Sequence, residues 1–174
     1  MPKKNELQMS DKNKSDRKKW FAMDAAIVAV LLFIDQISKY FAIVHLKDQP
    51  AYVLWQGVFE LRYLENRGTA FGLFLNQKAF ILIACALFLI VIGVVLYKLP
   101  DSAKSVKYHV LLSFIIAGGV GNMIDRIRFD YVVDFLYFVL IDYPIFNIAD
   151  SFIVVATILL FILVLREKDF DLNG

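Results

Sequence analysis

Apolar residues in this 174-residue chain gather in four long runs, at about residues 20–44, 79–97, 108–124 and 145–165. A helix needs about 20 mostly apolar residues to cross the hydrocarbon core of a bilayer. Backbone groups in lipid must find hydrogen bonds within their own segment, so each run is expected to be helical. The pattern predicts an all-α integral membrane protein with four transmembrane helices.

The segment between the first two runs follows a different period. In residues 58–63, the side chains of Phe59, Leu61 and Tyr63 alternate with charged ones, which is typical of a strand with one apolar face. Residues 55–57 offer a turn before it. We therefore expect a small extracytoplasmic β-sheet in the first outer loop, acting as a mobile cradle over the membrane surface.

Lysine and arginine are distributed unevenly along the chain. Residues 1–19 carry seven of them and the short loop 98–107 carries three, although the net charge of the whole chain is only +2. Basic residues concentrate on the cytoplasmic side of membrane proteins, so we place both termini in the cytoplasm. Residues 1–19 are expected to form a flexible basic tail, followed by one membrane domain over 20–170. The small net charge argues against a nucleic-acid partner.

Several ionisable or amide side chains interrupt the apolar runs, where each is costly. At a rise of about 1.5 Å per residue, Asp35, Asn122 and Asp150 all lie roughly 21–22 Å from the inner ends of their helices. Lys39 and Arg126 each follow one turn after such a residue. We expect three helices to bring these groups into one layer of the outer half of the membrane. Asp35 and Lys39 could also simply neutralise each other.

Other polar and small residues have plainer explanations. Asp125, beside Arg126, is interpreted as half of a structural ion pair, and Asp24 as an interfacial group at the inner end. The third run also contains three glycines that would permit close contact between helices, Gly118, Gly119 and Gly121.

Two aspartates, Asp134 and Asp150, are flanked by apolar residues on both sides, which is unusual for solubilising groups. Two carboxyl groups in contact cannot both ionise readily and therefore share a proton. One can then activate a water as a base while the protonated one polarises a carbonyl. This predicts peptide-bond hydrolysis with no metal ion and no cofactor. A small proton- or ion-coupled transporter and a catalytically silent assembly subunit are the alternatives, since acidic residues in a membrane also line ion pathways.

The chain resembles the lipoprotein signal peptidases, the bacterial type II signal peptidases. Five short blocks carry the resemblance, in order along the chain: Asp35-Gln36-x-Ser38-Lys39, Asn66-x-Gly68-x-Ala70-Phe71-Gly72, Gly118-Gly119-x-Gly121-Asn122-x-x-Asp125-Arg126, Val132-Val133-Asp134-Phe135 and Phe146-Asn147-x-Ala149-Asp150-Ser151. Together they extend over most of the chain.

The resemblance implies a membrane aspartic endopeptidase that removes the signal peptide from prolipoproteins, cutting just before a diacylglyceryl-modified cysteine. Its catalytic pair would be Asp134 and Asp150. The positions implied to support the pair or contact substrate are Asn66, Gly68, Asn122, Arg126 and Asn147, with Asp35 and Lys39 as scaffold. The expected location is the bacterial cell membrane, with the site near its outer face. Membrane lipid and globomycin-type inhibitors are expected partners, and a monomer is expected.

Overall fold

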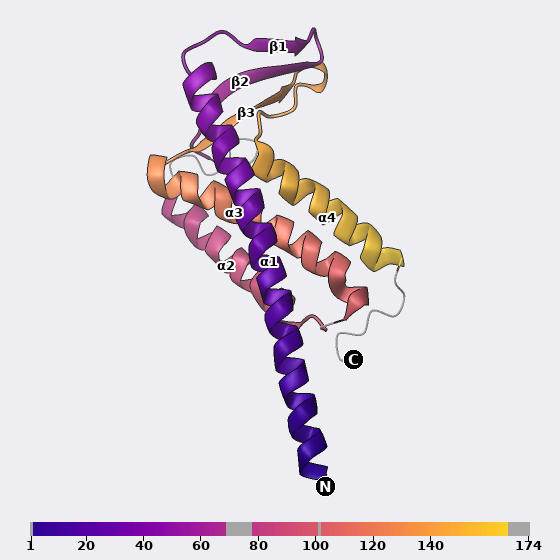
Figure 1. The fold of residues 1–174 in the computed structure, drawn as a ribbon. Helices are drawn as coiled ribbons and strands as arrows, with labels where there is room; N and C mark the ends of the chain where they lie inside the picture. The colour runs from indigo at the N-terminus through magenta and orange to yellow at the C-terminus, as the bar shows by residue number, and fades with distance from the viewer. Residues whose placement is uncertain (1, 69–77, 101, 167–174) are drawn as a thin grey trace.

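Four helices form a bundle with a small sheet at one end in the computed structural model of the chain (Figure 1). The structure describes residues 2–68, 78–100 and 102–166, with side chains from Arg17 onward. The elements in chain order are α1 (Pro2–Leu46), β1 (Tyr52–Trp55), β2 (Phe59–Asn66), α2 (Lys78–Lys98), η2 (Ala103–Ser105), α3 (Val106–Phe129), β3 (Val132–Phe138), η3 (Val139–Ile141) and α4 (Ile148–Arg166).

Each of the four helices contains a segment long and apolar enough to span a membrane, and these segments are Arg17–Leu46, Lys78–Lys98, Ala103–Phe129 and Ile148–Arg166. Large apolar side chains cover the outside of the bundle: Phe33 is 69% exposed and Phe161 is 64% exposed. Such a surface needs hydrocarbon rather than water around it. The predicted four-span membrane architecture is confirmed.

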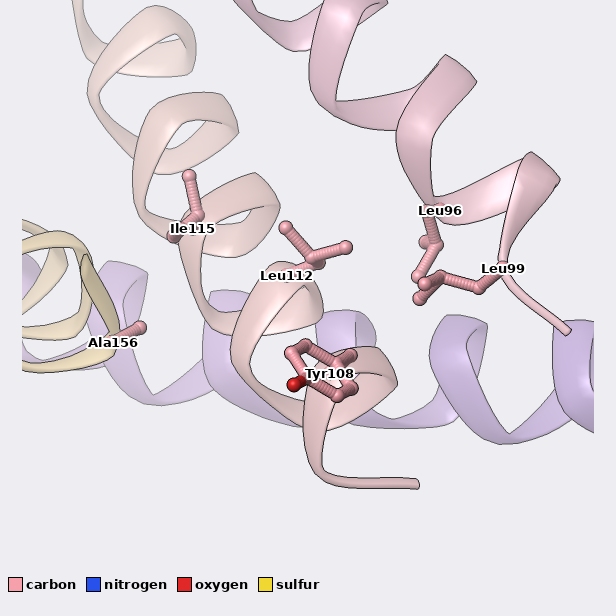
Figure 2. Packing of buried hydrophobic residues seen from close by; sticks show 6 residues of the cluster. All are labelled: Leu96, Leu99, Tyr108, Leu112, Ile115 and Ala156. Carbon is pink, nitrogen blue, oxygen red and sulfur yellow. The ribbon is translucent and has the colours of Figure 1, made fainter. Parts of the chain in front are cut away.

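Helix α3 is the central element and contacts the other three helices. Half of its apolar window is buried, against 11% for α2 and α4. Figure 2 shows one core cluster, in which α3 meets the end of α2 and a small residue of α4. Its members are Leu96, Leu99, Tyr108, Leu112, Ile115 and Ala156. Because α3 is enclosed, polar side chains that it carries can be held away from both lipid and water.

The basic N-terminal segment was expected to be a flexible tail, and this prediction is wrong for residues 2–19. Helix α1 begins at Pro2 and extends well beyond the other helices (Figure 1). Lysine, glutamate, leucine and glutamine are good helix formers. The first span is already helical, so extending the helix toward the N-terminus avoids the free-energy cost of nucleating a new one. Proline is also favoured at the first position of a helix.

Two helix boundaries differ from the apolar pattern. Helix α3 runs on to Phe129 and ends at Asp130, whose φ of 67° is left-handed and whose N–H bonds to Arg126 O. Helix α4 begins at Ile148 rather than near 145, because Asn147 caps it: Asn147 Oδ1 accepts the Asp150 N–H at 3.0 Å. Local capping chemistry, not hydrophobicity, therefore sets both boundaries.

The sheet has three antiparallel strands in the order β1-β2-β3. The predicted strand is confirmed as β2, and the predicted turn is confirmed by the Val58 N–H, which bonds to Trp55 O at 3.0 Å. Strand β3 was not predicted. It is covered by α1, where Ala42 packs with Val133 and Phe135 in a second core cluster. This contact fixes the sheet to the end of the bundle.

At the opposite end of the bundle, Asp24, which was expected to be an interfacial group, is enclosed by other side chains and only 4% exposed. Its carboxylate lies 2.9 Å from His109 Nδ1 and accepts a hydrogen bond from Ser113 Oγ at 3.3 Å. Trp20 stacks on the His109 ring with centroids 4.8 Å apart. The pair links α1 to α3, so burying this carboxylate is compensated by specific partners.

Candidate active site

Asp150 lies in the first turn of α4, where the local sequence builds a reciprocal cap. The Asn147 side chain accepts the Asp150 N–H, and Asp150 Oδ2 accepts the Asn147 N–H at 3.2 Å. This is the geometry of a capping box, with asparagine and aspartate in the two positions. Asp150 Oδ1 also accepts the side-chain amide of Asn122 at 2.7 Å. Both donors and the helix N-terminus stabilise negative charge at this carboxylate.

Asp134 projects from β3 opposite Leu64 of β2 and is only 1% exposed. Its two oxygens accept hydrogen bonds from Asn66 Nδ2 at 2.8 Å and from Asn147 Nδ2 at 2.7 Å. Burial, and then the neighbouring charge of Asp150, raise the pKa of Asp134 from its ordinary value of 3.8 to about 7. Asp134 is thus a carboxyl group that can hold a proton near neutral pH.

Asn147 joins the two aspartates directly. Its side chain donates to Asp134 and its backbone N–H donates to Asp150, and the residue is fully buried. The structure therefore brings Asp134 and Asp150, 16 positions apart in the sequence, into one cluster at the junction of β3 and α4. A pair of coupled carboxyl groups in such a position can divide the roles of acid and base.

The expected polar layer across three helices is confirmed beneath this cluster. Lys39 of α1 lies 3.0 Å from Asp35 and donates to Asn122 Oδ1 of α3 at 2.9 Å. Asn122 in turn donates to Asp150 of α4. Asp35, Lys39 and Asn122 are all buried, so the layer is a connected network rather than a set of surface charges.

Arg126 connects α3 to the end of β2. Its guanidinium donates to Gly68 O at 2.9 Å and to Asn122 O at 3.3 Å. The Gly68 N–H donates to Asn66 Oδ1 at 3.0 Å, so Asn66 is held while its amide contacts Asp134. All seven predicted supporting residues therefore lie in this cluster. The remaining members of that sequence block, Ala70, Phe71 and Gly72, lie outside the described residues.

The predicted ion pair between Asp125 and Arg126 is wrong. Asp125 instead lies 3.0 Å from Lys39 and accepts the Val133 N–H at 3.2 Å. Neighbouring residues on a helix point about 100° apart, so they do not face each other. Gln36, also missed, donates to Asp125 Oδ1 at 3.1 Å. Helical spacing could have found Asp125, because it lies one turn after Asn122.

The three glycines of α3 do permit close approach, as expected. A Cβ on Gly118 would overlap the backbone oxygen of Ala149 and the side chain of Ile153 in α4. A Cβ on Gly121 would overlap the Asp35 carboxylate. The absence of side chains here lets α1 and α4 bring their polar groups against α3.

Comparison with known proteins places this chain in a family. The family model described as "Signal peptidase (SPase) II" matches residues 27–166. A relative from Caldanaerobacter subterraneus subsp. tengcongensis, named lipoprotein signal peptidase, is 41% identical over 79% of this chain and 92% of its own length. One of the same name from Clostridium tetani is 36% identical over 86% of this chain and 96% of its own length.

The fold has known counterparts as well. A solved bacterial membrane enzyme superimposes with a TM-score of 0.76 at 28% identity, covering 86% of this chain and 93% of its own. The match to a peptidase family does not support the alternative of an ion-coupled transporter. The chain, in which Asn147 links the buried Asp134 of β3 to the half-buried Asp150 of α4, belongs to the signal peptidase II family.

Proposed function

We propose that the chain removes the signal peptide from prolipoproteins as an aspartic endopeptidase, cutting just before a diacylglyceryl-modified cysteine, with Asp134 and Asp150 as its catalytic pair. The observation that carries the proposal is the pair itself: the buried Asp134 and the half-buried Asp150, both hydrogen-bonded to Asn147. The family and the names of its relatives supply the substrate class.

The surroundings of the two carboxyl groups support different roles. Asp150, at the N-terminus of α4 and facing the Asn122 amide, is the base that takes a proton from a water molecule. Asp134, with its raised pKa, is the acid whose proton polarises the scissile carbonyl. The water oxygen adds to the carbonyl carbon, and the proton gained by Asp150 passes to the leaving nitrogen. The C–N bond then breaks, which leaves a carboxylic acid and a free amine.

The neighbouring residues act by holding this pair. Asn66 and Asn147 donate to Asp134, Asn122 donates to Asp150, and Arg126 holds the backbone of Gly68. Precise placement of reacting groups accounts for a large part of enzymatic rate enhancement. Asp35 and Lys39 form the scaffold below them.

Exposed apolar side chains on β1 and η3 support the proposal that a lipidated substrate reaches the site laterally, from within the bilayer. Trp55 is 67% exposed, and Leu140 and Ile141 are 70% and 69% exposed. We propose that these side chains lie at the membrane interface and that the sheet is a mobile cradle for the substrate. Membrane lipid and globomycin-type peptides, the latter between the two aspartates, are the further partners we propose, with the chain acting as a monomer.

For location we propose the bacterial cell membrane, with both termini in the cytoplasm and the site near the outer face. Lys98 ends α2, and Arg17 and Lys18 precede the first apolar run, which supports this orientation by the distribution of positive charge. Residues 1–19 would then be a cytoplasmic extension of a single membrane domain over 20–170.

The test is cleavage of a diacylglyceryl-modified prolipoprotein by the purified protein, with and without globomycin. Asp134→Asn and Asp150→Asn are each expected to abolish cleavage while the protein stays folded. Asp48→Asn is the matched control, because Asp48 is an exposed aspartate whose left-handed φ of 58° suits asparagine. Persistent cleavage by either dyad variant would overturn the assignment of the pair.

A further inference from the structure

Lys39 is the centre of a buried charge cluster that contains neither Asp134 nor Asp150. Its ammonium group contacts Asp35 Oδ2 and Asp125 Oδ2 at 3.0 Å each, and Asn122 Oδ1 at 2.9 Å. All three of its N–H donors therefore have acceptors. Gln36 also donates to both acids, at 3.1 Å each. Buried ion clusters contribute little net stability compared with apolar residues of the same volume, so stability alone is a weak explanation for this one.

Asp125 reaches from this cluster to the strand that carries one member of the pair. The oxygen that contacts Lys39 also accepts the Val133 N–H at 3.2 Å. Val133 is fully buried and immediately precedes Asp134. A side chain of α3 thus holds the first residues of β3 against that helix. Because Asp134 directly follows Val133, this contact also fixes the position of Asp134.

Asp35 makes the equivalent contact with the other segment. Its Oδ1 accepts the Ala149 N–H at 3.2 Å, while its Oδ2 contacts Lys39. Ala149 is fully buried and immediately precedes Asp150. Gly121 leaves the space that the Asp35 carboxylate occupies. Two acids that share one lysine therefore each hold the backbone one residue before an aspartate of the site.

We propose that Asp125 and Asp35 are positioning residues of the peptidase reaction, and that they set the separation of the two catalytic carboxyl groups by binding the Val133 and Ala149 N–H groups. This inference rests on the proposed roles of the aspartate pair. Lys39 is the common counter-ion that keeps the two acids at a fixed distance from each other. A displacement of about 1 Å at the reacting groups can lower a rate roughly 100-fold, so such a scaffold matters for kcat even though it touches no substrate.

The test compares Asp125→Ala with Asp125→Asn, measuring kcat and KM for a lipidated prolipoprotein and the melting temperature in detergent. Alanine removes the acceptor, and kcat should fall at least about thirtyfold while KM changes less than about threefold. Asparagine keeps an oxygen for the Val133 N–H, and kcat should stay within about fivefold of the original value. If Asp125→Ala does not fold, Asp125→Ser, with a shorter side chain, replaces it.

Asp24→Ala is the matched structural control. Asp24 is also a buried acid between α1 and α3, but it pairs with His109 at the far end of the bundle. This control should lower the melting temperature about as much as Asp125→Ala and leave kcat unchanged. An equal loss of kcat in both variants, or equal effects of alanine and asparagine at Asp125, would overturn the positioning role.

Asp134→Asn and Asp150→Asn belong in the same experiment, because they separate two kinds of failure. If either still cleaves, the proposed catalytic pair is wrong whatever Asp125 does. If both are inactive while Asp125→Ala retains full kcat, the pair stands and the positioning inference alone is wrong.

Discussion

Asn122 donates its side-chain amide to Asp150 at 2.7 Å, and the opposite end of that amide is fixed because Asn122 Oδ1 accepts Lys39 Nζ at 2.9 Å. Lysine can only donate, so the amide oxygen must face it and the NH₂ group must face the carboxylate. The charge of Lys39 therefore reaches Asp150 through an oriented dipole. The two ends of an isolated amide group are hard to distinguish, but here Lys39 and Asp150 determine how the Asn122 amide is oriented.

Replacing Asn122 with aspartate should remove this donor and place a like charge beside Asp150. We expect kcat to fall by about 100-fold or more, the usual effect of losing one preorganised hydrogen-bond donor in an active site. Single-turnover cleavage of a lipidated prolipoprotein measures it directly. An Asn122→Asp variant with kcat near that of the original protein would show that the amide has no part in the reaction.

Asn147 both caps α4 and donates a hydrogen bond to Asp134, and one substitution separates these two roles. Serine is a good N-cap, so Asn147→Ser should keep the start of α4 while losing the amide that reaches Asp134. We expect a melting temperature close to the original with a kcat lowered at least about tenfold. Asn147→Ala should lose the cap as well, at a cost of about 1 kcal/mol in stability. Equal melting temperatures for the two variants would contradict the capping role.

The four helices and strand β2 were predictable because their signals are local. A bilayer span needs only length and apolarity, and a strand with one covered face shows a period of two. Strand β3 has neither signal: Val132–Phe138 is nearly continuous in apolar residues, and its first four residues are all buried. Such a run cannot be distinguished from a buried helical segment by periodicity alone.

The convergence of Asp35, Asn122 and Asp150 was predictable from depth, since a helix converts sequence separation into distance along the membrane normal. Partner choice was not predictable in the same way. Asp125 bonds to Lys39 and Val133 rather than to its sequence neighbour, because those contacts depend on how three elements meet. Helical spacing could exclude Arg126 as the partner of Asp125, but it could not identify Lys39 and Val133 as the actual partners.

The raised pKa of Asp134 predicts how activity depends on pH. If Asp134 supplies the acidic proton, that proton is lost as pH rises through about 7, where the pKa of this buried carboxyl lies. kcat should therefore decrease as pH rises through this value. Measuring kcat at saturating substrate between pH 5 and 9 tests it, and a flat profile over that range would exclude Asp134 as the acid.

The same pKa predicts an effect on stability with a definite sign. Asp134 binds its proton more tightly in the folded state, with a pKa of about 7, than in the unfolded state near 3.8. Its stabilising contribution is therefore fully present below pH 3.8 and is lost as pH rises to about 7. Asp134→Asn cannot ionise, so its melting temperature relative to the original protein should increase between pH 5 and pH 8. Asp48→Asn should show no such trend, and a decrease for Asp134→Asn would reverse the assigned sign.

The contact between α3 and α4 gives the last prediction. An added methyl group at Gly118 would meet the backbone oxygen of Ala149, one residue before Asp150, and the side chain of Ile153 at 2.7 Å. Backbone cannot rotate away as a side chain can, so α4 itself must shift. We expect Gly118→Ala to cost about 1–3 kcal/mol in stability, as overpacking usually does, and to lower kcat because the capped turn that carries Asp150 moves with the helix.

Gly93 provides the control for this substitution, because a methyl group there meets nothing within 4 Å. Gly93→Ala in the middle of α2 should raise the melting temperature slightly, since alanine is favoured over glycine in a helix by about 1 kcal/mol, and kcat should not change. Melting temperature and cleavage of the lipidated substrate are measured for both variants. If Gly118→Ala is as stable and active as Gly93→Ala, then the close approach of α3 to α4 is not what holds Asp150 in place.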